Sequence, residues 1–228
     1  MASADEALPC DRLSGHDNLT LVSEQEWDER YAASDRIWSG RPNAALVASA
    51  APLEPGRALD VGCGEGADAV WLAQRGWNVT GLDVSGVALE RGLAWATEND
   101  VAVEWVKSGL LDADLPARSF DLVAVLYPPL PRTPDREVER VLAGLVAPGG
   151  HLLVVHHAPL PAGELHGHGS DGHRPDFGVM VAPESVRPVL GEGWVIEVDE
   201  AGDRPAVEGA GAHHVEDLVL MARRTSDG

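Results

Sequence analysis

A strand, a glycine-rich turn and a helix follow one another from residue 57 to residue 77, and this unit constrains the fold more than any other part of the chain. The segment "RALDVG" is a short apolar run that ends in glycine, and "ADAVWLAQRGW" then places its apolar residues at helical spacing. Further apolar runs alternate with helical patterns downstream. Such an alternation is typical of a parallel sheet covered by helices on both faces.

The remaining elements are predicted from the same periodicity. Pro148 and the glycines after it are expected to end the last helix before strand five. The predicted strands lie at 77–83, 101–108, 120–127 and 151–157, and the predicted helices at 86–100 and 135–150.

The C-terminal part predicts a helix at 183–190 and two strands at 194–200 and 214–224, with no helical signal between those strands. Two strands joined in this way form an antiparallel pair. The expected fold class is therefore α/β, with a doubly wound, mostly parallel seven-stranded sheet whose last strand is antiparallel.

The N-terminal part predicts a helical cap. Ser23 and Glu26 have the spacing of a capping box, which indicates a helix in front of the sheet. We expect a disordered tail at residues 1–20 and one domain over residues 21–225, in which residues 21–50 form a helical cap segment.

Charge narrows the possible partners. The chain has 37 acidic against 17 basic residues and a formal net charge of −20, which repels phosphate backbones and anionic lipids and attracts cations. No apolar run approaches the ~18 residues of a membrane span, and the first twenty residues lack a secretory signal pattern. We expect a cytoplasmic protein with no nucleic-acid or membrane partner. Its two cysteines, Cys10 and Cys63, form no disulfide framework.

The glycine turn predicts an adenosine-containing ligand. Gly62, Gly64 and Ala67 fit the loose dinucleotide fingerprint, and Asp83 follows Gly62 by 21 positions, where a carboxylate can accept hydrogen bonds from ribose hydroxyls. A pyrophosphate would be repelled by the turn, whereas a sulfonium and an amino group would be attracted. The turn has no lysine or arginine, but it carries three carboxylates: Asp60, Glu65 and Asp68.

At this point the chain resembles the seven-stranded, class I S-adenosylmethionine-dependent methyltransferases. Four motifs carry the resemblance in the family's order and spacing: "ALDVGCGEG" (58–66), "VTGLDVS" (79–85), "FDLVAVLY" (120–127) and "VAPGGHLLVV" (146–155). The front segment 26–46, "EWDERYAASDRIWSGRPNAAL", resembles the group that includes tellurite-resistance and thiopurine methyltransferases. In that group the leading helix and its tryptophan-containing turn cover the cofactor.

The resemblance implies S-adenosyl-L-methionine as cofactor and assigns roles by position. Asp60 would lie near the methionine amino group, Asp83 would hold the ribose, Val84 would touch adenine, and Trp38 would close the site. Gly109 stands where relatives often have an aspartate that binds the adenine amino group. Three alternatives follow: the backbone at 109 suffices, Asp112 compensates, or the affinity for the cofactor is reduced. The full implied set is Trp38, Asp60, Gly62, Cys63, Gly64, Asp83, Val84, Gly109, Leu110 and Leu126.

The acceptor is predicted to be a small molecule that presents S, Se, Te or O. Methyl transfer is an in-line displacement in which alignment supplies much of the catalysis, and a base helps only an acceptor that holds a proton. The segment "LYPPLP" (126–131) lacks the polar first residue and the aromatic of amino-group methyltransferases, because Tyr127 and Leu130 occupy those positions. A proline-stiffened loop that leads to a helix start at Pro134 is the simpler interpretation.

Several side chains are candidates for the acceptor site. Trp27 and Tyr31 line an aromatic pocket or pack the front helix onto the sheet, Tyr127 ends strand four, and Arg204 would hold an anionic acceptor. His157, at the end of strand five, is the candidate catalytic base, since side chains alternate along a strand and only one of His156 and His157 can easily face the cleft.

Three further histidines, His166, His168 and His173, lie among glycines. A solvated loop, a substrate lid and a metal site are the alternatives for this stretch, and we predict no metal. A nicotinamide-dependent oxidoreductase and a non-catalytic S-adenosylmethionine-binding protein remain the alternative functions. The sequence gives no indication of oligomeric state.

Overall fold

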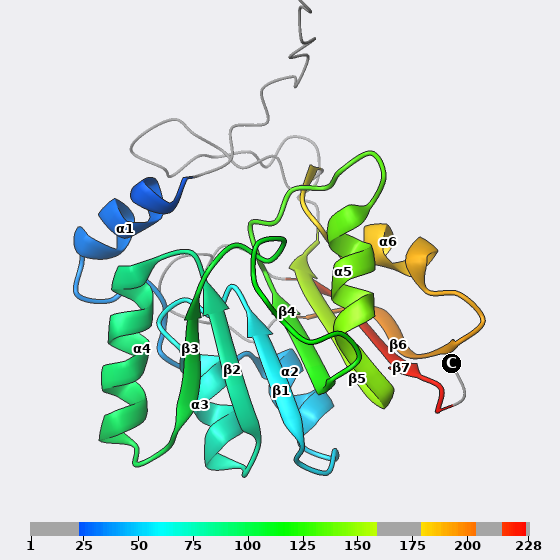
Figure 1. Ribbon diagram of the computed structural model, residues 1–228, viewed down its shortest axis with the longest axis horizontal. Coiled ribbons are helices and arrows are strands. Elements are labelled where there is room, and N and C mark those ends of the chain that lie inside the picture. The colour runs from blue at the N-terminus through cyan, green and yellow to red at the C-terminus, as the bar shows by residue number, and fades with distance from the viewer. Residues whose placement is uncertain (1–22, 159–178, 204–215, 227–228) are drawn as a thin grey trace, which may run out of the picture.

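A computed structural model describes residues 23–158, 179–203 and 216–226. Its centre is a seven-stranded sheet with the order β3-β2-β1-β4-β5-β7-β6 (Figure 1). β7 pairs antiparallel with both of its neighbours, and the remaining pairs are parallel. The strands are β1 (Arg57–Val61), β2 (Asn78–Asp83), β3 (Val103–Lys107), β4 (Phe120–Leu126), β5 (Val146–His157), β6 (Trp194–Asp203) and β7 (Glu216–Arg224). The predicted fold class is confirmed.

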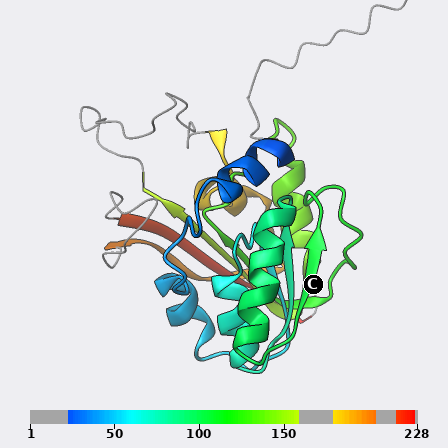
Figure 2. The ribbon, with the colours of Figure 1, turned by 90° about the vertical axis from the view of Figure 1, so that its left-hand side faces the viewer.

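Helices cover both faces of the sheet, as Figures 1 and 2 show. One face packs against α2 (Ala44–Ala50) and α3 (Ala67–Gln74) through an apolar cluster that includes Leu46 and Leu72. The other face packs against α5 (Glu137–Leu145) through Leu142. The remaining helices are α1 (Glu24–Ala32), α4 (Gly86–Glu98), α6 (Pro183–Val186) and the 3-10 turn η2 (Arg187–Val189).

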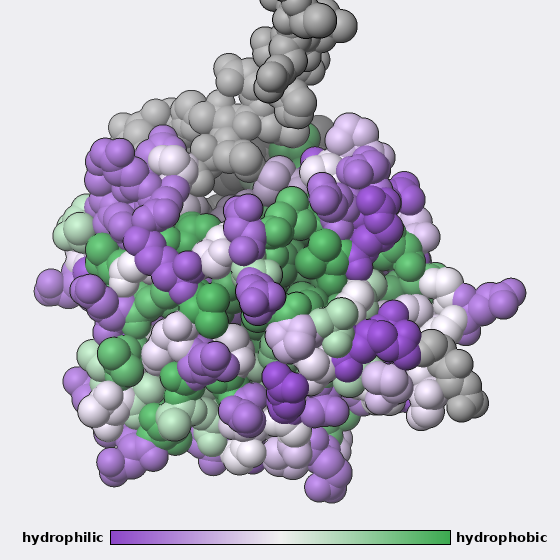
Figure 3. Space-filling view, in the orientation of Figure 1, coloured by the Kyte–Doolittle hydropathy of each residue, from purple (hydrophilic) through white to green (hydrophobic). Residues whose placement is uncertain are grey.

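The predicted helical cap is present as α1, which packs against α4. The Ser23 side chain accepts from the Glu26 N–H, and the Glu26 carboxylate accepts from the Ser23 N–H at 2.7 Å, so the capping box is formed. Figure 3 shows mostly hydrophilic surface over α1 and apolar surface nearer the middle of the same face. Tyr31 is the residue of α1 that is buried.

One predicted boundary is wrong in detail. The helix expected over 135–150 begins at Glu137 and ends at Leu145, three residues before Pro148, and β5 begins at once with Val146. Helical backbone is disfavoured in the residue before proline, and the proline ring clashes with the carbonyl four residues earlier. The β4–β5 ladder then passes from Phe120↔Val146 to Leu122↔His151, so residues 147–150 form an irregular insertion.

None of the helices in the described ranges is long and apolar enough to cross a membrane.

Candidate active site

The glycine turn leads from β1 into α3 and is hydrogen-bonded to the end of β2. Gly62, Gly64 and Gly66 all have positive φ, at 69°, 51° and 83°, a region that side-chain-bearing residues rarely adopt. The N–H groups of Gly62 and Cys63 both donate to the Leu82 carbonyl, at 2.8 and 3.0 Å. The turn is thus tied to the end of β2 before α3 begins, with Gly66 as the N-cap of that helix.

Asp83, at the end of β2, faces this turn. Its Oδ2 accepts from the Gly64 N–H at 2.8 Å and its Oδ1 accepts from the Ser85 N–H at 2.9 Å. Burial raises the pKa of Asp83, and these backbone hydrogen bonds oppose that shift. A carboxylate oxygen has two lone pairs, so both oxygens still have room for a donor such as a ribose hydroxyl.

Asp60 is a buried carboxyl group without a full set of partners. It is 2% exposed, and among the described residues its Oδ2 has no hydrogen-bond partner. Burial raises its pKa well above the usual range, and the charges of Asp68 and Asp83 raise it further. Burial also raises the pKa of Asp68 to about 6, although its carboxylate accepts from the Asn43 N–H at 2.6 Å. Three carboxyl groups converge here, and a cation among them would relieve their repulsion.

The front segment lies directly over the glycine turn. A Cβ at Gly64 would be 2.9 Å from the Tyr31 hydroxyl and 3.4 Å from Trp38 Nε1, and that indole N–H donates to the Tyr31 hydroxyl at 3.0 Å. Tyr31 is buried, Trp38 is 39% exposed, and the Trp27 ring lies 5.9 Å from the Tyr31 ring. Tyr31 and Trp38 therefore both pack against the glycine turn. From the sequence, Trp38 was expected at the cofactor site and Tyr31 at the acceptor site.

Glu65 and Arg91 hold this segment, and sequence reasoning missed that role. The Glu65 carboxylate accepts from the N–H groups of Ile37 and Trp38 at 3.2 and 3.1 Å, and from the Arg91 guanidinium at 2.9 Å. Arg91 also donates to the carbonyls of Tyr31 and Ser34, each at 2.7 Å. Two charged residues of the sheet domain thus bind the backbone of the front segment, a role that sequence spacing does not signal.

The region after β3 contains the departure from the family pattern. Gly109 is half-buried, and a Cβ there would be 3.3 Å from Asp112 Oδ2, so the Asp112 carboxylate lies beside the place that an aspartate at 109 would fill. Leu110 is buried in the core. Val84 and Leu126, which follow β2 and end β4, are both half-buried.

Tyr127 and His157 meet at the same end of the sheet. Their rings stack with centroids 4.2 Å apart and an interplanar angle of 19°. Asp217, from the start of β7, touches both: the Tyr127 hydroxyl donates to Asp217 Oδ2 at 2.6 Å, and His157 Nδ1 lies 3.5 Å from Asp217 Oδ1. His156 points to the other face and is 3% exposed, and burial lowers its pKa. Sequence reasoning missed Asp217, because only the strand register places it opposite His157.

Some predicted positions lie outside the described residues. These are Arg204 and the three histidines of the glycine-rich stretch, His166, His168 and His173. Within the described ranges, no group of three or more His, Cys, Asp or Glu residues is arranged to hold a metal ion.

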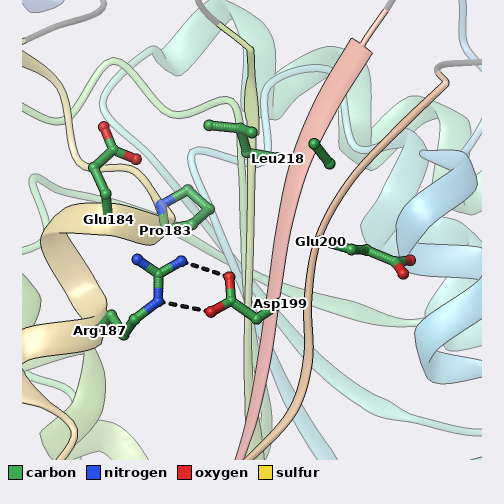
Figure 4. A pocket seen from close by; sticks show the side chains of 7 residues that line it. Pro183, Glu184, Arg187, Asp199, Glu200 and Leu218 are labelled. Atoms are coloured by element: carbon green, nitrogen blue, oxygen red, sulfur yellow. Dashed lines mark hydrogen bonds and ion pairs between the residues drawn. The ribbon is translucent and has the colours of Figure 1, made fainter.

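A surface hollow of about 170 Å³ lies away from this site, between α6 and the edge strand β6 (Figure 4). Arg187 and Asp199 face each other across it, with Arg187 Nε donating to Asp199 Oδ2 at 2.8 Å. Because β6 is an edge strand and the glycine turn follows the inner strand β1, this hollow is separate from the glycine turn.

Comparison with known proteins finds a similarity to methyltransferases in the central part of the chain. Residues 58–150 match a family model described as "Methyltransferase domain". An uncharacterized methyltransferase of Mycobacterium tuberculosis is 38% identical over 123 residues, which is 53% of this chain and 61% of that protein. The ubiquinone biosynthesis O-methyltransferase of Alkalilimnicola ehrlichii is 41% identical over 105 residues, 44% of this chain and 41% of that protein. The chain thus matches only about two to three fifths of these relatives' lengths.

Solved structures share the fold over nearly the whole chain. A structure reported for the conversion of a disulfide bond into a thioacetal group during echinomycin biosynthesis has a TM-score of 0.66 at 24% identity and covers 90% of this chain and 93% of its own. TehB from Haemophilus influenzae has a TM-score of 0.59 at 15% identity, with 89% and 66% covered. At such identities the likeness shows the fold alone. Residues 58–150 thus resemble a methyltransferase domain, and the chain shares its α/β fold with these solved structures.

Proposed function

We propose that this protein transfers the methyl group of S-adenosyl-L-methionine to a heteroatom of a small-molecule acceptor, S, Se, Te or O. The observation that carries the proposal is the buried carboxyl group of Asp60, which lies beside Asp68 and Asp83 at the glycine turn and has one oxygen without a hydrogen-bond partner in the described part of the chain. A cationic ligand stabilises such a group, whereas an anionic pyrophosphate would be repelled. A nicotinamide cofactor is therefore the poorer fit.

The residues present fit the cofactor. S-Adenosyl-L-methionine, when bound, supplies a methyl group activated by a positive sulfonium. Asp83 would accept the ribose hydroxyls, Gly62 and Gly64 would admit the ligand close to the backbone, and Asp60 would face its positive charge. Trp38 and Tyr31 would cover the turn and exclude water. Val84, Leu110 and Leu126 are the proposed apolar contacts, with Cys63 and Gly109 at the backbone.

A small acceptor is supported by charge and by one relative. The net charge of −20 repels nucleic acid. The ubiquinone biosynthesis O-methyltransferase is named for a small-molecule pathway, which favours an acceptor of that kind here. The finer likeness to the tellurite-resistance and thiopurine methyltransferases rests on the front segment, which lies over the glycine turn through Tyr31 and Trp38. Trp27, Tyr127 and Arg204 are proposed to contact the acceptor.

Two measurements test this function. Calorimetric titration with S-adenosylhomocysteine, NAD and NADP separates a methyltransferase from an oxidoreductase, and we expect binding of the first alone. Transfer of labelled methyl from S-adenosyl-L-methionine is then measured across thiols, phenols and the oxyanions of selenium and tellurium. Tight binding without transfer to any acceptor would favour the non-catalytic alternative, and nicotinamide binding would overturn the proposal.

A further inference from the structure

We propose that Asp217 is a positioning residue that orients His157 as the general base of the proposed methyl transfer, which narrows the acceptor to a molecule with an ionisable hydroxyl such as a phenol or an enol. The inference rests on the proposed function, because it names the acceptor class and the proton path of the same site.

The strand register brings the pair together. His157 and Asp217 are direct partners in the antiparallel β5–β7 ladder, with His157 Nδ1 3.5 Å from Asp217 Oδ1. Each side chain is only 10% exposed, so water screens their interaction weakly. A carboxylate beside one ring nitrogen favours the proton on that nitrogen and leaves the other, Nε2, as the acceptor of a proton.

Tyr127, which follows β4, holds the carboxylate of Asp217 in place. The backbone of Tyr127 has a φ of 50°, and its N–H donates to the Val155 carbonyl at 2.9 Å. Its hydroxyl donates to Asp217 Oδ2 at 2.6 Å, and its ring stacks on that of His157. A hydrogen bond to the ionised form of a carboxyl group favours that form. The residue after β4, the last residue of β5 and a residue of β7 thus form an arrangement in which the imidazole is held by stacking and by charge.

The arrangement adjoins the glycine turn. A Cβ at Gly62 would be 3.6 Å from the Cβ of Pro128, the residue after Tyr127, and β1 and β4 are neighbours in the sheet. Ligands of open parallel sheets bind beyond the carboxyl ends of the strands, where both segments lie. An acceptor beside His157 would therefore be next to the proposed cofactor.

The proposed step balances in atoms and charge. The acceptor oxygen forms a bond to the methyl carbon, the bond between that carbon and the sulfonium sulfur breaks with its electron pair going to sulfur, and the hydroxyl proton goes to His157 Nε2 and later to water. Asp217 stabilises the imidazolium formed in this step. Thiolates and chalcogen oxyanions hold no such proton and need no base.

The charged and titratable groups that face His157 in the described part of the chain are Asp217 from β7, the Tyr127 phenol after β4, and the edge of the His156 ring at 6.0 Å. Beyond His156, Arg132 and Glu184 form an ion pair with each other. Asp217 is therefore the charge expected to govern the titration of His157.

The experiment compares Asp217→Asn with Glu216→Gln, a control that removes an exposed carboxylate from the adjacent position. Two readouts are used: the pH profile of methyl transfer to a phenol, and the imidazole titration of His157 by NMR without cofactor, assigned with His157→Gln. We expect Asp217→Asn to move both the profile and the titration to lower pH and to lower the plateau rate by at least about tenfold. His157→Gln should lose about 10²- to 10⁴-fold, and Glu216→Gln should match wild type.

The contrary results are distinct from a failure of the proposed function. If Asp217 only joins β5 to β7, Asp217→Asn will lower Tm while the His157 titration and the pH profile stay in place, and the inference is overturned. Turnover on thiols or chalcogen oxyanions but on no hydroxyl would likewise overturn it and leave the proposed methyl transfer intact. Failure to bind S-adenosylhomocysteine would instead contradict the proposed function, and the NMR titration would still decide the pairing.

Discussion

The carboxylate of Asp83 accepts a hydrogen bond from the Gly64 N–H at 2.8 Å, so the residue that ends β2 is joined to the turn that follows β1. In a parallel sheet both positions lie at the same edge, but this contact also aims the carboxylate into the turn. One side chain therefore shapes the glycine turn and presents the oxygens proposed to hold the ribose.

Replacing Asp83 by asparagine should weaken cofactor binding. The amide oxygen can still accept from Gly64, but the charge is lost, and a hydrogen bond to a charged group contributes about 1.5–3 kcal/mol. We expect S-adenosylhomocysteine to bind about 10- to 100-fold more weakly in calorimetry. Asp114→Asn, which alters an exposed carboxylate between β3 and β4, is the matched control and should bind as wild type does. Equal affinity of all three proteins would remove the ribose role of Asp83.

Asp60→Asn should stabilise the unliganded protein at pH 7 and impair cofactor binding. Burial raises the pKa of Asp60 above the ~3.9 of an unfolded chain, so the folded state holds the proton more tightly. Wild-type stability therefore falls as pH rises from ~4 through the raised pKa, and the Asp60 contribution to this fall is absent in the variant.

Calorimetric unfolding from pH 4.5 to 7.5 checks this expectation. The Tm of Asp60→Asn should exceed that of wild type by an amount that grows with pH. Asp68, whose pKa of about 6 lies in the same window, should leave a residual slope in both proteins. Asp114→Asn serves again as the control. A variant less stable than wild type at pH 7 would show that Asp60 is ionised and satisfied in the native state.

The sequence predicted the sheet well because its strands are apolar nearly throughout and glycine or proline separates them. It placed Asp83 beside the glycine turn for the same reason, since parallel strands end at one edge. It did not reveal Asp217, because the pairing with His157 depends on the register of β5 against β7, which the pattern of apolar residues leaves undetermined. The contacts of Glu65 and Arg91 to backbone groups likewise depend on tertiary packing.

Arg91→Met should loosen the front segment without unfolding the sheet. The guanidinium joins the Glu65 carboxylate to the carbonyls of Tyr31 and Ser34, and these contacts hold the residues that cover Gly64. Hydrogen exchange of residues 31–38 should accelerate, and S-adenosylhomocysteine should dissociate faster.

The matched control for this change is Arg75→Met, since Arg75 is the C-cap of α3 and its guanidinium lies over the Trp71 ring at 4.1 Å. Exchange in residues 31–38 should then stay at the wild-type rate. If Arg91→Met also leaves that rate unchanged, apolar packing of α1 rather than the ion pair holds the front segment.

Two helical glycines should respond in opposite directions to alanine. A Cβ at Gly92, in α4, would lie 2.7 Å from Cη2 of Trp105, whereas a Cβ at Gly144, in α5, meets nothing within 4 Å. In a helix, alanine is more favourable than glycine by about 0.5–1 kcal/mol, so Gly144→Ala should raise Tm by a few degrees.

At Gly92 this gain is outweighed by overpacking of about 1–3 kcal/mol, because the Trp105 indole also contacts the places where a Cβ would stand at Gly66 and Gly81. In thermal unfolding, the Tm of Gly92→Ala should be lower than that of wild type. Combining Gly92→Ala with Trp105→Phe should recover part of the loss. If Gly92→Ala and Gly144→Ala had the same Tm, the indole of Trp105 would have to move aside at no cost.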